Sequence, residues 1–197
     1  MNLPNKLTVS RIVLTFIFMF FVFSKGLSFK ILALVIFIAA ALTDLFDGRI
    51  AKSRNLITDF GKIMDPIADK ILVLAAFLSF IQLQLIPAWC VIVIIARELA
   101  VTSLRIFAFS KGVVIAASKG GKHKTVSQMA AIIIILLSLI FKDVMKTYFF
   151  WNPVFDKVIG NTIYVAMLST AALTLISGMS YMWYNRHLFI GLKSAEK

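Results

Sequence analysis

The sequence predicts an all-α integral membrane protein, a bundle of six transmembrane helices formed by one domain over residues 1–197. Composition supports this fold class, because 60% of the residues are hydrophobic and the mean hydropathy is +0.94. These values exclude an ordinary soluble domain. Apolar runs also recur along the whole chain with short polar segments between them, and about 20 apolar residues cross a bilayer as a helix.

Each expected span is an apolar run with polar residues at its ends. A short interfacial segment precedes the first span, because Pro4, Lys6 and Arg11 interrupt the apolar pattern there. Pro66 suits the first turn of the third span, where its missing N–H leaves no bond unmade. The aromatic residues from Tyr181 to Tyr184 are typical of an interfacial belt. The expected spans are about residues 8–24, 29–47, 66–80, 88–109, 126–141 and 163–184.

Basic residues indicate the orientation of these spans. Six spans place both termini on one side, whose segments hold thirteen Lys and Arg residues against five in the opposite segments. This asymmetry predicts a multi-pass protein of the cell membrane with both termini in the cytoplasm. The net charge of +12 is spread between spans and does not form one stripe, which favours contact with anionic lipid and argues against nucleic acid.

Four of the nine acidic residues lie close together at the predicted cytoplasmic ends of spans 2 and 3. Asp44 and Asp47 are three positions apart, and Asp65 and Asp69 are four apart, so each pair shares one face of a helix. If the two helices pack antiparallel, the carboxylates face a common pocket. Such oxygen ligands suit two hard divalent cations, which clamp phosphate oxygens in displacements at phosphorus. Roles as helix caps or solvated loop residues are disfavoured, because carboxylates beside apolar helices are costly unless a cation binds them.

Small residues accompany the aspartates. Gly48 follows Asp47, and Gly61 stands four residues before Asp65. Each glycine allows a bulky anionic ligand or a neighbouring backbone to approach where a Cβ would intrude, and Ala51 keeps the same face shallow.

Basic side chains near spans 4 and 5 suit a second phosphate group. Arg105 lies toward the cytoplasmic end of span 4 and has no carboxylate one turn away. Lys119, Lys122 and Lys124 belong to a glycine-containing loop that is expected to enter a helix at Thr125, and such a loop offers ammonium groups and backbone N–H groups to phosphate. The same lysines also fit positive-inside topology and lipid headgroups.

Arg97 and Glu98 lie deep within span 4, where charges usually face a bundle interior or a wet cavity. They serve either a functional site or as structural ties to other helices. The sequence leaves both roles open.

The stretch from Asp44 to Asp69 resembles the signature of the CDP-alcohol phosphatidyltransferase family. That pattern reads Asp, two residues, Asp-Gly, two residues, Ala-Arg, eight residues, Gly, three residues, Asp, three residues, Asp. One position departs from it, because Lys52 stands where the family has Arg. Lysine keeps the charge but lacks the bidentate fork of arginine, which Arg54 is placed to supply instead.

The resemblance implies transfer of a phosphatidyl group from a CDP-diacylglycerol to an alcohol, with release of CMP. It implies that Asp44, Asp47, Asp65 and Asp69 bind two divalent cations, Mg2+ or Mn2+. Asp69, the last Asp of the signature, would also be the general base on the acceptor hydroxyl. The residues implied to line the cytidylate pocket are Gly48, Ala51, Lys52 and Gly61.

Softer matches at Asn2–Arg11, Arg97-Glu98, Thr102–Arg105, Lys122–Thr125 and Gln128 resemble the branch of the family that uses glycerol 3-phosphate. They imply phosphatidylglycerophosphate as product, a homodimer, and an acceptor phosphate held by Arg105, Lys119, Lys122 and Lys124.

Two other functions stay open at this point. The same chemistry could serve another acceptor, such as inositol phosphate, serine or a second phospholipid. A divalent-cation transporter would use the four aspartates as a transit site, but transporters place such sites near the membrane midplane and these lie at one face. A purely structural scaffold leaves the carboxylates unexplained.

Overall fold

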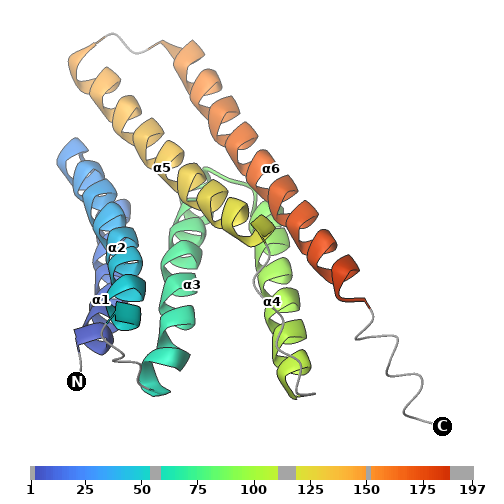
Figure 1. Cartoon of the computed structure of the whole chain (residues 1–197). Coiled ribbons are helices and arrows are strands. Elements are labelled where there is room, and N and C mark those ends of the chain that lie inside the picture. Colours follow the sequence, from blue (N-terminus) through green and yellow to red (C-terminus); the bar gives the residue numbers. More distant parts are fainter. Residues whose placement is uncertain (1–2, 54–58, 111–118, 150–151, 187–197) are drawn as a thin grey trace. The chain divides into compact units, whose positions relative to one another are not determined.

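The computed structural model describes residues 3–53, 59–110, 119–149 and 152–186, and every regular element within these ranges is an α-helix. Figure 1 shows the helices, labelled α1 to α6. The all-helical class is therefore confirmed. The helices are α1 (Leu3–Phe23), α2 (Leu27–Ser53), α3 (Asp59–Gln82), α4 (Ala88–Ser110), α5 (Lys119–Tyr148) and α6 (Pro153–Tyr184).

The chain divides into two compact units. The first unit comprises α1, α2 and α3 together with the end of α5 and the start of α6, from Ile132 to Ile163. The second comprises α4, the start of α5 up to Ala131, and α6 from Tyr164 onward.

In the first unit, α1 packs against both α2 and α3 (Figure 1). Phe18 of α1 and Phe37 of α2 are fully buried, with ring centroids 5.7 Å apart. Ala33 and Ala40 lie one turn to either side of Phe37, so small residues let the two helices approach around the aromatic pair. The buried face of α3 carries Ala68, Leu72, Ala76 and Phe80 at helical spacing.

Residues 3–10 are part of α1, so the described chain has no separate interfacial segment before the first helix. Arg11, which the sequence placed in the interfacial segment, has a buried side chain. Thr8, Arg11, Thr15 and Phe18 follow one another at intervals of three and four residues, which puts all four on the same buried face. The buried face of α1 therefore includes polar side chains as well as apolar ones.

The turn between α1 and α2 closes tightly. Gly26 adopts a φ of +115°, a conformation that a side chain would strain. The Lys30 ammonium donates a hydrogen bond to the carbonyl of Val22, one of the last carbonyls of α1, which have no partner within the helix. Ammonium groups stabilise the C-terminal end of a helix for the same reason.

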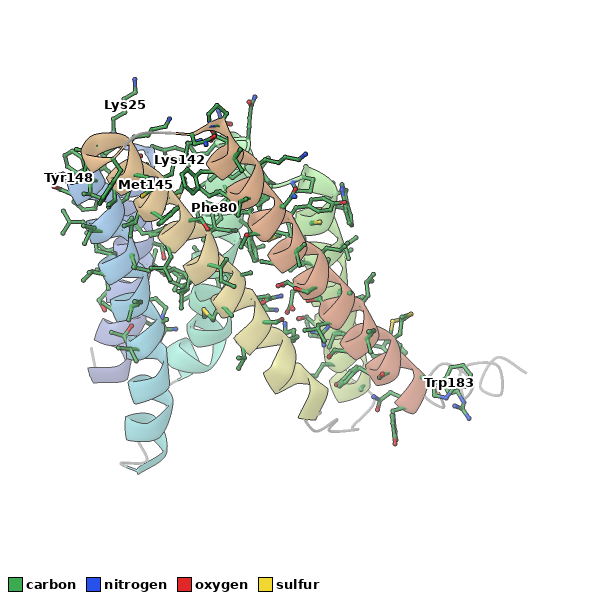
Figure 2. All side chains as sticks on the ribbon, turned by 90° about the horizontal axis from the view of Figure 1, so that it is seen from above. Lys25, Phe80, Lys142, Met145, Tyr148 and Trp183 are labelled. Carbon is green, nitrogen blue, oxygen red and sulfur yellow. The ribbon has the colours of Figure 1, made fainter. Side chains whose placement is uncertain are left out.

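The turn between α5 and α6 lies at the same end of the first unit. Asp143 of α5 interacts electrostatically with Lys30, next to the α1–α2 turn. Figure 2 shows Lys25, Lys142 and Tyr148 at this end. The helix α6 begins at Pro153 after Asn152, whose Oδ1 accepts a hydrogen bond of 3.0 Å from the N–H of Val154, as an N-cap residue does.

In the second unit, α4 presents a regular buried face toward its neighbours. Cys90, Ile94, Val101 and Leu104 lie on this face, and Arg97 occupies the position between Ile94 and Val101. The position of Cys90 in the core is as predicted. A charged side chain therefore stands where the repeat otherwise places apolar ones, and it requires polar partners.

Two predicted helix starts are wrong. The helix α3 begins at Asp59, so Pro66 lies in its interior and not in its first turn. The helix α5 begins at Lys119, so the predicted glycine-containing loop that enters a helix at Thr125 is itself helical. In a helix interior glycine costs about 1 kcal/mol and proline about 3 relative to alanine, so these residues lower the helix propensity of a segment without excluding a helix.

Two helices of the described chain are long and apolar enough to span a membrane, over Lys124–Tyr148 and Pro153–Tyr184. Shorter apolar stretches cover Thr8–Phe23, Leu27–Thr43 and Lys70–Gln82. Exposed large apolar side chains also occur on every helix, which is typical of a protein surrounded by lipid tails. Examples are Phe16, Phe20, Val35, Leu78, Ile92, Ile106, Leu137 and Ile176.

Candidate functional site

The four aspartates of the signature lie on consecutive helices of the first unit. Asp44 and Asp47 belong to the last turns of α2, and Asp65 and Asp69 belong to the first half of α3. The two helices are in contact. Asp47 and Asp65 are each six residues from the end of their helix that is nearer to the α2–α3 connection, and Asp44 and Asp69 lie one turn further along α2 and α3.

The side chains of these aspartates lie outside the described residues, and so do the side chains of the predicted cytidylate pocket. Among the side chains that are described, no group of three or more His, Cys, Asp or Glu residues could hold a metal ion. The aspartate site therefore stays a prediction. The cytidylate-pocket positions are Gly48, Ala51 and Lys52 on α2 and Gly61 on α3.

A network of charges ties together the three helices of the second unit. Arg97 of α4 donates a hydrogen bond of 3.1 Å from Nη2 to Oγ of Ser177 on α6, and its Nη1 lies 3.3 Å from Oε1 of Glu98. The same carboxylate oxygen forms an ion pair with the ammonium of Lys124 on α5. All three charged side chains are largely shielded from solvent. Both Arg97 and Glu98 thus tie α4 to other helices, one of the two roles that the sequence left open.

A polar face on α6 meets this network. Thr170, Thr174, Ser177, Gly178 and Tyr181 follow at helical intervals and lie on one side of α6. A Cβ at position 178 would stand 2.7 Å from Cγ of Arg97. Gly178 is therefore the place where the arginine side chain crosses α6.

The prediction of an interfacial aromatic belt was wrong for Tyr181. This residue is 4% exposed and packs with Val101 and Leu104 of α4, whereas Trp183 and Tyr184 are 69% and 84% exposed. The helical spacing from Thr174 to Tyr181 was a signal in the sequence that the two residues share a face. Sequence reasoning missed it because α4 is far away along the chain.

The predicted acceptor-phosphate residues all belong to the second unit. Arg105 is exposed on α4, one turn after Val101. The side chain of Lys124 is largely shielded from solvent and paired with Glu98. Lys119 and Lys122 lie in the first turn of α5, and their side chains are outside the described residues.

The first unit also has an open apolar pocket of about 350 Å³ between the end of α5 and the start of α6. It offers no titratable group, so it carries no chemistry of its own. Its lining residues are Ile134, Leu137, Ser138, Phe141, Val158, Ile159 and Thr162.

Comparison with known proteins identifies the family of this chain. A family model described as CDP-alcohol phosphatidyltransferase matches residues 1–159. The chain belongs to the CDP-alcohol phosphatidyltransferase family. The resemblance of the Asp44–Asp69 stretch is thereby confirmed, and the chain is an enzyme of this family.

Curated relatives within the CDP-alcohol phosphatidyltransferase family are similar over most of the chain. A protein of Bacillus subtilis (strain 168), named CDP-diacylglycerol–glycerol-3-phosphate 3-phosphatidyltransferase, is 45% identical over 148 residues, which cover 69% of this chain and 77% of the relative. A protein of Rickettsia typhi with the same name is 36% identical over 175 residues, 86% of this chain and 98% of the relative. A protein of Mycobacterium tuberculosis (strain H37Rv), named probable phosphatidylglycerophosphate synthase, is 35% identical over 184 residues, which cover 92% of this chain and 80% of the relative.

The family model does not extend over most of α6. The residues matched by the family model include α1 to α5 and end at position 159, near the start of α6. Thr174, Ser177, Gly178 and Tyr181 lie beyond that point. The polar face of α6 lies outside the residues that the family model matches.

Proposed function

We propose that this phosphatidyltransferase transfers the phosphatidyl group of CDP-diacylglycerol to glycerol 3-phosphate, forming phosphatidylglycerophosphate and CMP in the synthesis of anionic phospholipids. The observation that carries the proposal is the similarity to relatives that are named for this reaction, at 45% identity in the first case and over 86% of the chain in the second. The Asp44–Asp69 signature supplies the matching chemistry.

The donor set of the signature fits divalent cations. Asp44, Asp47, Asp65 and Asp69 offer only carboxylate oxygens, and hard cations such as Mg2+ and Mn2+ prefer such ligands. When bound, two cations supply the positive charge that neutralises a pyrophosphate and stabilises a departing CMP. The four aspartates would hold them at the connection of α2 and α3.

Asp69 would also act as general base. Its carboxylate accepts the proton of the primary hydroxyl of glycerol 3-phosphate while that oxygen attacks the phosphorus that bears the diacylglycerol. The bond from this phosphorus to the bridging oxygen of the pyrophosphate breaks, and CMP leaves with the electron pair. A base is needed because an alcohol is a poor nucleophile at neutral pH.

The remaining predicted residues would bind the two substrates. The cytidylate would lie against a surface of small residues and one cation, and the doubly charged acceptor phosphate would meet several cations. The proposed cytidylate residues are Gly48, Ala51, Lys52 and Gly61. The proposed acceptor-phosphate residues are Arg105, Lys119, Lys122 and Lys124.

We further propose that α1 to α6 are six membrane spans, with both termini and the aspartates on the cytoplasmic side, in a homodimer. The common end shared by the α1–α2 and α5–α6 turns supports this topology, because an alternating path through the membrane places both turns on the same, outer side. The exposed apolar side chains on every helix support lipid contact.

The test is CMP release by the purified chain in detergent with CDP-diacylglycerol, Mn2+ and separate acceptors: glycerol 3-phosphate, inositol phosphate, serine and phosphatidylglycerol. Glycerol 3-phosphate should be the preferred acceptor. Asp69→Asn should lower turnover by about 10²- to 10⁴-fold, the usual worth of a general base. Asp156→Asn, which changes an exposed carboxylate on α6, is the matched control and should retain full turnover.

Three results would contradict the proposal. Preference for inositol phosphate, serine or phosphatidylglycerol would assign the chain to another reaction of the family. Full turnover of Asp69→Asn would remove the assigned base. Uptake of divalent cations into proteoliposomes without CDP-diacylglycerol would instead support the transporter.

A further inference from the structure

The open apolar pocket between the end of α5 and the start of α6 takes no part in the proposed reaction. All of its lining residues belong to the first unit, so its shape is set within that unit. Its volume of about 350 Å³ accommodates about ten groups of the size of a water molecule, at about 30 Å³ each, which is a large part of one acyl chain. We call this pocket the α5–α6 groove, and its residues are Ile134, Leu137, Ser138, Phe141, Val158, Ile159 and Thr162.

The α5–α6 groove presents an apolar wall to its occupant. Its two polar lining residues turn their hydroxyl groups back to their own helices. Oγ of Ser138 donates a hydrogen bond of 2.7 Å to the carbonyl of Ile134, and Oγ1 of Thr162 donates one of 2.9 Å to the carbonyl of Val158. Both hydroxyls are thereby satisfied without a ligand. The occupant is therefore held by apolar contact, which suits an acyl chain.

Two contacts between α5 and α6 fix the end of the groove that is nearer to the α5–α6 turn. The rings of Phe141 and Phe155 meet edge to face, with their centroids 6.3 Å apart. At the next residue of each helix, Nζ of Lys142 donates a hydrogen bond of 2.6 Å to Oδ1 of Asp156. These contacts hold the two helices at a set spacing, so the groove is a preformed site.

Positive charge gathers at the same end of the first unit, where Figure 2 shows Lys25 and Lys142. The described residues around the α1–α2 and α5–α6 turns include five lysines and two aspartates, a net charge of +3, and each aspartate interacts with one of these lysines. Lys157 is exposed and directly precedes the groove residue Val158. Ammonium groups beside an apolar groove are complementary to an anionic phospholipid. The charged residues are Lys25, Lys30, Lys142, Lys146, Lys157, Asp143 and Asp156.

We propose that the α5–α6 groove binds one acyl chain of an anionic membrane phospholipid, whose phosphate lies against Lys157. This lipid is distinct from the donor substrate. The helix α2 runs from the α1–α2 turn, at the charged end, to the α2–α3 connection over 27 residues, which is about 40 Å of helix. In the proposed topology the bound lipid belongs to the leaflet opposite the aspartates.

The first experiment measures lipid retention without catalysis. The full chain is purified in detergent, and native mass spectrometry records the binding of phosphatidylglycerol and phosphatidylcholine. Phosphatidylglycerol should bind more tightly. Ser138→Phe and Thr162→Phe fill the groove and should weaken the binding of both lipids roughly tenfold or more. The matched control is Ser169→Phe, at an exposed position of α6 outside the groove whose hydroxyl also bonds to its own helix, and it should bind lipid like the unchanged chain.

The second experiment tests the headgroup contact. Lys157→Gln should weaken the binding of phosphatidylglycerol about fivefold, the usual contribution of one basic residue near anionic lipid, and leave phosphatidylcholine unaffected. Lys25→Gln removes the same charge at the α1–α2 turn and should have a smaller effect. Thr162 and Lys157 are exposed, so their variants should melt within a few degrees of the unchanged chain when no lipid is added.

Several outcomes would overturn the inference. Unchanged retention in both Ser138→Phe and Thr162→Phe would show that the groove binds no acyl chain. Equal losses in Lys157→Gln and Lys25→Gln would show that diffuse charge attracts the lipid. Displacement of the groove lipid by one equivalent of CDP-diacylglycerol would assign the groove to the donor. A changed oligomeric state in Ser138→Phe with intact retention would make the groove an interface with a second copy. Retention lost as expected supports the groove even if glycerol 3-phosphate releases no CMP, because the two readouts are independent.

Discussion

Replacing Gly178 with alanine tests how tightly Arg97 is held against α6. The added Cβ would lie 2.7 Å from Cγ of Arg97 and 3.6 Å from its Cδ. Carbon atoms in contact are about 3.5 to 4.0 Å apart, so the arginine must move by about 1 Å. That movement breaks its 3.1 Å hydrogen bond to Ser177.

The magnitude follows from two opposing terms. A hydrogen bond to a charged group contributes about 1.5 to 3 kcal/mol to stability, and alanine improves on glycine in a helix by about 1 kcal/mol. Gly178→Ala should therefore lower the free energy of unfolding by roughly 0.5 to 2 kcal/mol, a fall of a few degrees in melting temperature.

Gly160, on the same helix, is the matched control. A Cβ there would meet no atom within 4 Å, so Gly160→Ala keeps the helix-propensity gain without the clash. Its melting temperature should be unchanged or higher. Gly178→Ala should likewise become neutral or stabilising when combined with Arg97→Ala, which removes the atoms it strikes. Equal effects of the two glycine substitutions, or a cost that persists without the arginine side chain, would show that the proposed contact does not exist.

Three further predictions concern other parts of the molecule. Phe18→Ala should cost on the order of 3 kcal/mol in a thermal melt, because it empties a fully buried site, whereas Phe16→Ala on the exposed face of the same helix should cost less than about 1 kcal/mol. In a double-mutant cycle of Glu98→Gln and Lys124→Met, the two changes should couple by more than about 1 kcal/mol, and additive effects would mean that the buried ion pair contributes nothing. Chelation with EDTA should stop CMP release, and Mg2+ or Mn2+ should restore it; turnover that survives chelation would contradict metal dependence.

Local sequence signals predicted the family and several helices correctly. The helix α4 was expected at residues 88–109 and is found at Ala88–Ser110, because Pro87 and the polar residues around Lys111 mark its ends. The Asp44–Asp69 signature lies in one stretch of the chain, so its spacing can be recognised without any knowledge of the fold. The family match confirms the resemblance.

Features that depend on distant residues were harder to predict. The sequence around Tyr181 is typical of an interfacial aromatic belt. The residue packs instead with Val101 and Leu104, which lie about 80 positions earlier in the chain. Pro66 is typical of a helix start, because proline is favoured in the first turn, whereas α3 extends back to Asp59. The buried face of α1, by contrast, had a local signal that the prediction missed, because Thr8, Arg11 and Thr15 follow one another at helical spacing.

The placement of two lysines on α5 has a consequence for the lipid environment. Lys124 and Lys142 are eighteen positions apart on α5 and each pairs with a carboxylate, so about 27 Å of this helix lies between the two lysines. This length is close to the hydrocarbon thickness of an ordinary or slightly thin bilayer. Longer acyl chains would impose hydrophobic mismatch and draw one charged pair toward the oily layer. Reconstitution in lipids of graded chain length should therefore show an optimum for this enzyme at short to medium chains.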